Sequence, residues 1–95
     1  MKVYLDDIRE PGKGWIWVRR PSDVIHLLMT GKVEQVSLDH DLGIDATGYD
    51  VLTWIEEQVV RFHFIPPEIL IHTDNPPARE RMEAAVKQIT KLQNM

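Results

Sequence analysis

The stretch VSLDHDLG, residues 36–43, sets two carboxylates and an imidazole directly after an apolar run. The segment Val36–Leu38 is typical of the buried end of a β-strand, and Asp39, His40 and Asp41 follow it. Burying carboxylates in an apolar site costs several kcal/mol unless a partner compensates their charge. The stretch therefore raises the question whether that partner is a cation, a capped loop or a substrate.

Four strand-like runs, of which this stretch ends the third, predict a sheet. Runs rich in β-branched and aromatic residues occupy 2–5, 15–18, 33–38 and 69–71. Helical patterns separate the later runs, so the expected order is β, β, α, β, α, β, α. Strands that alternate with helices predict an α/β fold with a parallel sheet and right-handed crossovers.

Three helices are expected between and after these strands. The first begins at Pro21 and stops at Gly31. The second follows Thr47, which forms a capping box with Asp50, and the third follows Asn75 as its N-cap. Helical spacing predicts the buried faces of the last two helices, which consist of Val51, Leu52, Ile55, Val59 and Phe62 in one and Met82, Val86, Ile89 and Leu92 in the other.

Polar residues follow three of the strands. Asp6 and Asp7 end the first, Asp39–Asp41 end the third, and His72–Asn75 close the fourth. Binding sites of open parallel sheets lie outside the carboxyl ends of the strands. These residues, far apart in the sequence, are therefore expected to meet at one edge of the sheet.

A divalent cation is expected among these carboxylates. Several carboxylates in one crevice repel one another and raise one another's pKa, and a cation removes that repulsion. Oxygen ligands favour Mg²⁺ or Mn²⁺, with Ca²⁺ as a further candidate, over zinc. We expect Asp7 and Asp39 to be direct ligands, with Asp6 acting through water or from behind them. Asp41 would add its backbone carbonyl or its side chain.

His72 is the candidate general acid or base, because an imidazole titrates near neutral pH. The competing interpretation is a histidine that only hydrogen-bonds a loop carbonyl. Thr73 and Asn75 are expected to donate hydrogen bonds to a phosphate, helped by the N-terminus of the last helix. Pro76 and Pro77 weaken that help, since neither offers an N–H group.

Two arginines are the nearest cations for a phosphate. Arg9 and Arg79 flank the predicted crevice, although each is also typical of a surface charge. His40 is a weaker candidate for substrate binding, since its ring can point away from Asp39 and Asp41. Substrate binding is therefore expected to involve Arg9, Arg79 and His40 beside Thr73 and Asn75.

Composition limits the class of protein. The 95 residues suit one domain over 1–95, and their net charge of −4 argues against general binding of nucleic-acid phosphates. No lysine or arginine lies between Lys32 and Arg61, where the acidic residues gather. The chain has no cysteine, which excludes disulfides and thiolate sites. With no signal-like or membrane-spanning segment, a cytoplasmic protein is expected.

One rival explanation of the acidic stretch is a calcium-binding EF-hand loop. The spacing Asp39-x-Asp41-x-Gly43-x-Asp45 imitates such a loop. An EF-hand needs glycine at its sixth position, where this chain has Ile44, and it follows a helix rather than a strand. This interpretation is therefore set aside.

The motifs together resemble a known family. The chain has LDDIR at 5–9, GWIWVR at 14–19, SLDHDLG at 37–43, TGYDVLTWIE at 47–56 and HTDNPPARERM at 72–82. This combination resembles the cyclic-phosphate-processing receiver domains, a compact relative of the response-regulator receiver fold. The resemblance covers nearly the whole chain.

The resemblance implies a truncated receiver, or flavodoxin-like, fold with four parallel strands in the order 2-1-3-4 and three main helices. It also implies metal-dependent processing of a cyclic or terminal phosphate on a nucleotide or an RNA end. In ordinary receivers the acidic pair binds Mg²⁺ and the residue matching Asp39 accepts a phosphoryl group. This chain departs from them, because no fifth strand with its lysine follows the last helix. One sheet face then lacks its usual cover, and we expect either a homodimer through that face or a last helix that crosses it.

Three functions follow as alternatives. The leading hypothesis is a divalent-metal-dependent phosphoric ester hydrolase in which Asp39 and His72 act in catalysis. The second is a receiver-like signalling or binding module without turnover, with Asp39 as potential phosphoacceptor. In the third, the carboxylates only cap loops, and no cation binds.

Overall fold

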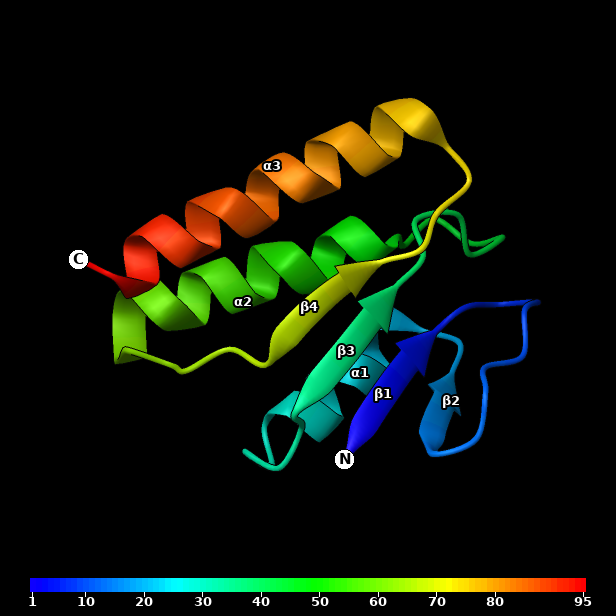
Figure 1. The fold of residues 1–95 in the computed structure, drawn as a ribbon, viewed down its shortest axis with the longest axis horizontal. Coiled ribbons are helices and arrows are strands. Elements are labelled where there is room, and N and C mark those ends of the chain that lie inside the picture. Colours follow the sequence, from blue (N-terminus) through cyan, green and yellow to red (C-terminus); the bar gives the residue numbers. More distant parts are fainter.

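The computed structural model describes all residues 1–95 and confirms the predicted architecture (Figure 1). In chain order the elements are β1 (Lys2–Leu5), β2 (Trp15–Val18), α1 (Pro21–Leu28), β3 (Gln35–Leu38), α2 (Gly48–Phe62), β4 (Glu68–Ile71) and α3 (Pro76–Gln93). The strands form one parallel sheet in the order β2-β1-β3-β4. This is the truncated α/β receiver-like arrangement that the sequence led us to expect.

Local signals place the helix starts correctly. Both halves of the capping box between Thr47 and Asp50 are present at the start of α2. The Asn75 side chain accepts a hydrogen bond from the Ala78 amide at the start of α3. The ends of α1 and β3 differ from expectation: α1 stops at Leu28 and β3 begins at Gln35. The predicted helix and the predicted strand were both too long, because the turn between Leu28 and Gln35 includes residues that we assigned to each of them.

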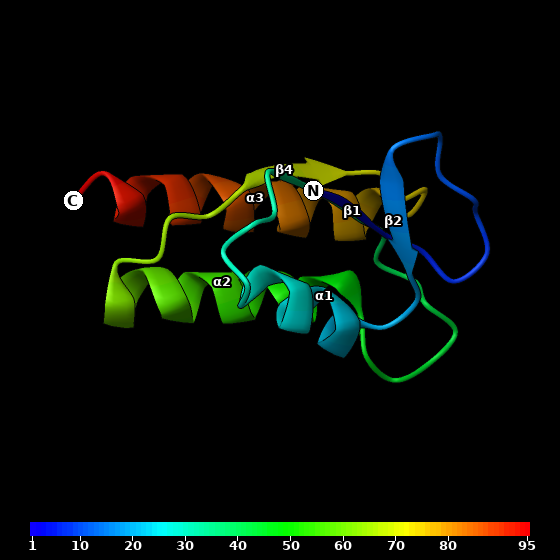
Figure 2. The same cartoon turned by 90° about the horizontal axis from the view of Figure 1, so that it is seen from below.

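The core lies between the sheet and its helices. Figure 2 shows α1 and α2 on one side of the sheet, while α3 runs beside α2 and along the outer edge of β4. The fully buried residues come from both layers and include Val3, Leu5, Val36, Leu38, Leu52, Ile55, Met82 and Ile89. This packing fixes the strand ends, and with them the loops that carry the acidic residues.

Phe62 was predicted to lie on the buried face of α2, and this prediction was wrong. Its side chain is 70% exposed. The helix ends there, and the chain turns through His63, whose φ of 54° lies in the left-handed region. The turn brings Phe64 back against Trp54 instead, with ring centroids 5.7 Å apart.

The second face of the sheet stays open. The register sets Tyr4 beside Trp17 and Ser37, and Ser37 beside Leu70, so these side chains share the face away from α1 and α2. The last helix does not cross this face, because α3 packs against α2 and β4 (Figures 1 and 2). A homodimer through the open face therefore stays a prediction. None of the three helices combines the length and the apolar character needed to cross a membrane.

Candidate metal and phosphate site

The carboxyl ends of β1, β3 and β4 meet in one acidic pocket of about 360 Å³. Its lining consists of Asp6, Asp7, Ile8, Arg9, Asp39, Asp41, Gly43 and Asp74, of which five are aspartates. Register explains part of this set. Leu5, Leu38 and Ile71 are aligned across the sheet, so the residues that follow them, Asp6, Asp39 and His72, leave the sheet side by side.

Asp6 is the most deeply buried of the carboxylates, at 3% exposure. Its Oδ1 accepts hydrogen bonds from the backbone amides of Ile8 (2.9 Å) and Arg9 (2.8 Å), and its Oδ2 lies 3.1 Å from His72 Nε2. Burial alone would raise the pKa of Asp6, but these hydrogen bonds to the ionised form together lower it. Asp6 is therefore a fixed carboxylate that also shapes the β1–β2 loop.

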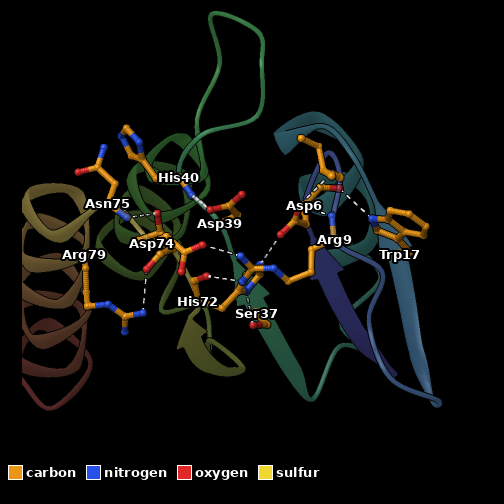
Figure 3. Close-up of polar contacts among 12 residues, drawn as sticks. Asp6, Arg9, Trp17, Ser37, Asp39, His40, His72, Asp74, Asn75 and Arg79 are labelled. Carbon is orange, nitrogen blue, oxygen red and sulfur yellow. Dashed lines mark hydrogen bonds and ion pairs between the residues drawn. The ribbon is translucent and has the colours of Figure 1, made fainter.

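His72 is held on three sides (Figure 3). Besides Asp6, its Nδ1 contacts the Ser37 hydroxyl at 2.7 Å, and its ring stacks on Tyr4 with centroids 4.3 Å apart. Burial lowers the pKa of His72, which favours the neutral ring at neutral pH. Because the Asp6 carboxylate can only accept, Nε2 carries the proton and donates to Asp6, while Nδ1 accepts from the Ser37 hydroxyl.

The pKa of Asp39 is shifted in the opposite direction to that of Asp6. Burial raises its pKa, and the charge of Asp6 adds to this, while the hydrogen bond from the His40 amide (2.8 Å) and one from the Thr73 side chain oppose it. In the absence of a cation, an ionised Asp39 is thus poorly compensated. Thr73 is buried and lies beside Asp39, as the sequence led us to expect.

The tightest group of potential metal ligands is Asp6, Asp39 and His72, whose donor atoms all lie within 4.8 Å of one another. The sequence hypothesis named Asp7 and Asp39 as direct ligands. Asp7 lines the same pocket, and its Oδ2 lies so close to Gly43 that a Cβ there would sit 3.1 Å from it. Asp6 and His72 already satisfy each other, which leaves Asp39 and Asp7 better able to bind a cation.

Asp41 and His40 form a contact of their own. His40 Nδ1 lies 2.8 Å from Asp41 Oδ1, so the ring faces Asp41 rather than pointing away from it. This hydrogen bond lowers the pKa of Asp41. Asn75 Nδ2 lies 3.5 Å from Asp41 Oδ2, and Asn75 Oδ1 caps α3 by accepting from the Ala78 amide. The Asn75 side chain therefore links the two loops at the rim of the pocket.

The two candidate arginines have different surroundings. Arg9 lines the pocket and reaches across to Asp74, with Nη2 2.6 Å from Oδ2 (Figure 3). Arg79 instead donates to the backbone carbonyls of Thr73 (2.8 Å) and Ile71 (3.4 Å) and is absent from the pocket lining. The structure thus brings Arg9 to the crevice and uses Arg79 to hold the β4–α3 connection.

Sequence reasoning missed three contributors to the site, namely Tyr4, Ser37 and Asp74. The alternation of side chains along a strand was the available signal for the first two. It places Tyr4 and Asp6 on one face of β1, and Ser37 on the same face of β3. Asp74 lies in the polar stretch after the fourth strand, but no sequence signal indicated that it would form an ion pair with Arg9.

Replacing Asp6 with alanine removes the acceptor of two amide hydrogen bonds and of the His72 bond. We expect the free energy of unfolding to fall by about 2–3 kcal/mol. Because the pKa of Asp6 is lowered in the fold, its contribution to stability is full above the ordinary pKa of 3.8 and is lost as the pH falls through the lower pKa of the folded state. Urea unfolding with EDTA present, near neutral pH and at successive values below 3.8, measures the difference between the two proteins.

Asp23, exposed near the start of α1, provides the control for this experiment. Asp23→Ala should change the free energy of unfolding by less than about 0.5 kcal/mol. A stability difference between native protein and Asp6→Ala that stayed constant through the acidic range would contradict the assignment.

Comparison with known protein families assigns most of the chain. A family model described as "Cyclic-phosphate processing Receiver domain" matches residues 1–88. The matched region includes all four strands, all of the pocket-lining residues and most of α3. Neither the curated proteins nor the solved structures include a match to the chain.

Proposed function

Because the chain belongs to the cyclic-phosphate processing receiver domains, we propose that it is a divalent-metal-dependent phosphoesterase. Its substrate would be a cyclic or terminal phosphate on a nucleotide or an RNA end. The observation that supports this proposal is the convergence of five aspartates and Arg9 in one acidic pocket at the carboxyl ends of the strands, with His72 hydrogen-bonded to Asp6.

The residues of the pocket fit Mg²⁺ or Mn²⁺, with Ca²⁺ as a further candidate. The donors are carboxylate oxygens, and the raised pKa of the half-buried Asp39 means that a nearby positive charge would relieve an existing penalty. Asp39 and Asp7 would hold the cation, with Asp41 at the rim and Asp6 fixed behind them by His72. When bound, such an ion supplies positive charge to the phosphate oxygens and lowers the pKa of a coordinated water.

The other groups of the pocket divide the remaining tasks. Arg9, which lines the pocket, would bind the phosphate. Thr73 and Asn75 follow β4 and do not line the pocket, so their contact with the phosphate stays a proposal. Asp39 would accept the proton of the water that forms the new P–O bond, and this proton would return to the leaving oxygen as the ester bond breaks. Both nitrogens of His72 are engaged by Asp6 and Ser37, so His72 would first orient Asp6. Action as general acid or base requires the ring to leave one of these partners.

A second candidate function is a receiver-like module without turnover. The observation that favours it is the position of Asp39 directly after β3, since the resemblance to receivers gives the residue at that place a phosphoacceptor role. The sheet of this structure has four strands and no fifth, so the lysine that ordinary receivers carry on the fifth strand has no counterpart in it. We rank this function second for that reason.

Incubation with a nucleoside 2′,3′-cyclic phosphate and Mn²⁺ tests the two functions together. The phosphoesterase opens the ring, and EDTA abolishes the reaction. A parallel incubation with acetyl phosphate would label Asp39 if the chain is a signalling module. Metal binding without hydrolysis of any cyclic or terminal phosphoester would overturn the enzyme proposal.

Asp74 is expected to restrain Arg9, and its removal should strengthen phosphate binding. The ion pair is open to solvent, with side chains 52% and 83% exposed, so its loss should change the stability of the fold very little. In Asp74→Asn the guanidinium is released, and we expect inorganic phosphate to bind several-fold more tightly in the presence of Mg²⁺. Isothermal titration calorimetry measures the change.

The control for this measurement is Glu57→Gln, which breaks the comparable pair with Arg61 on α2, outside the acidic pocket. It removes one negative charge without touching Arg9. Equal gains in the two variants would show that net charge alone controls phosphate affinity.

A further inference from the structure

A second pocket adjoins the acidic one. Its volume is about 240 Å³, and the walls are formed by the β1–β2 loop and by two indole rings on β2. The lining residues are Glu10, Pro11, Gly12, Lys13, Gly14, Trp15 and Trp17. The proposed reaction uses none of them.

The two pockets are structurally continuous. Ile8 and Arg9 of the β1–β2 loop line the acidic pocket, and the next five residues of the loop line the second. In addition, the Trp17 indole N–H donates a 2.8 Å hydrogen bond to the backbone carbonyl of Asp6 (Figure 3). Asp6 therefore connects the two pockets, because its backbone carbonyl binds the Trp17 ring and its carboxylate lines the acidic pocket.

The chemistry of the second pocket suits a flat ring carried by an anion. Trp15 and Trp17 lie on the same face of β2, with Cα atoms roughly 6.6 Å apart. One cation lies over each ring: Lys2 is 5.6 Å from the centroid of Trp15, and Arg19 is 4.1 Å from the centroid of Trp17. Lys13 adds a third cation at the pocket wall. Glu10 adds one negative charge to the lining, so the cations near the rings outnumber this carboxylate, and a base would stack on the indole surface that Lys2 and Arg19 leave uncovered.

We propose that this pocket binds the nucleobase of the nucleotide whose phosphate lies in the acidic pocket. Proteins recognise unpaired bases by stacking them on aromatic rings and arginine planes. The inference rests on the proposed function for the phosphate and adds the place where the base of that substrate would bind. A free nucleotide and the end of an RNA share this chemistry, and the test separates them.

Tryptophan fluorescence gives a readout that needs no turnover. The third tryptophan, Trp54, packs against Phe64 on α2 and is replaced in a Trp54→Phe background. Adenosine, which has a base but no phosphate, should quench the remaining emission with a saturable curve. Ribose 5-phosphate, which has a phosphate but no base, should not. An adenosine dinucleotide with a terminal phosphate should bind more tightly than adenosine monophosphate if the end of an RNA is the source.

Variants at the pocket wall check the assignment. Trp17→Leu and Trp15→Leu should each weaken adenosine binding by about tenfold or more. Lys13→Glu changes only the charge on the loop and should weaken adenosine monophosphate more than adenosine. Unaltered binding in all three variants, or equal binding of ribose 5-phosphate, would overturn the nucleobase site.

Calorimetry with Mn²⁺ on the same proteins separates this failure from a failure of the proposed function. If Mn²⁺ binds but adenosine does not quench the fluorescence, the base site is wrong and the proposed function is unaffected. That outcome includes the case in which a second copy of the chain covers the indole rings. If adenosine quenches the fluorescence but Mn²⁺ does not bind, the base site is supported and the proposed metal-dependent reaction is contradicted.

Discussion

Replacing Asp39 with asparagine is expected to abolish Mn²⁺ binding and, with EDTA present, to raise the melting temperature. The two effects share one cause. Burial raises the pKa of Asp39, so the fold carries an ionised group that it disfavours, and a bound cation would compensate that charge. Asparagine keeps the shape of the side chain but carries neither the charge nor its penalty.

The sign of the stability change follows from the pKa. A carboxyl group whose pKa is raised by folding makes the native state less stable above that pKa, and this penalty disappears as the pH falls to the ordinary pKa of 3.8. The gain in Asp39→Asn should therefore be largest near neutral pH, where we expect about 1 kcal/mol, a size common for stabilising substitutions. Differential scanning calorimetry across this range, with EDTA, measures it.

Asp45 provides the matched control. It lies on the same loop and is exposed, but it is absent from the lining of the acidic pocket. Asp45→Asn should leave Mn²⁺ binding and the melting temperature close to those of the native chain. If Asp39→Asn binds Mn²⁺ like the native protein, the cation does not depend on Asp39 and the proposed mechanism fails. If it binds no Mn²⁺ but melts lower, Asp39 has a structural role that its pKa does not reveal.

The sheet-edge site was predictable because it depends on topology. Parallel strands place their carboxyl ends together whatever their side chains are, so the meeting of Asp6, Asp39 and His72 followed from their positions after three strands. Strand order came from the family resemblance. The capping residues Thr47 and Asn75 were equally predictable, since capping is a local interaction.

What the sequence could not supply was the partner of each polar atom. Asp6 and Asp7 are adjacent and chemically identical, and only the folded loop decides that Asp6 turns inward to His72 while Asp7 stays at the pocket wall. The same holds for Arg9 and Arg79, of which one contacts Asp74 and the other the backbone carbonyl of Thr73. These differences depend on the conformation of the loops, which the spacing of residues in the sequence does not determine.

Gly48→Ala is expected to be among the most damaging single substitutions in the chain. Gly48 is the first residue of α2 and is buried, and a Cβ atom there would lie 1.8 Å from the Asp39 carbonyl oxygen and 3.2 Å from Met82 Cε. Methionine can move aside, but the backbone of Asp39 is fixed by its hydrogen bond to the Leu5 carbonyl. Relief therefore requires α2 to separate from the end of β3.

That separation would affect both stability and the site. Inserting a methyl group into a packed core costs about 1–3 kcal/mol, and contact with backbone atoms places this case at or above the upper limit. A loss of about 3 kcal/mol corresponds to a fall of roughly 15 °C in the melting temperature of a domain of this size. Because the displaced backbone belongs to Asp39, Mn²⁺ affinity should fall as well, even at temperatures where the variant is folded.

Gly12→Ala isolates this packing effect from the general effect of replacing glycine. No atom lies within 4 Å of a Cβ at Gly12, and its φ lies outside the left-handed region. The substitution should therefore leave stability unchanged or raise it by about 0.4–1 kcal/mol, because alanine restricts the unfolded chain. Thermal melts and Mn²⁺ titrations of both variants make the comparison. A Gly48→Ala protein that melts and binds Mn²⁺ like Gly12→Ala would mean that α2 moves freely relative to Asp39, and that the position of the candidate metal ligand does not depend on the packing of this helix.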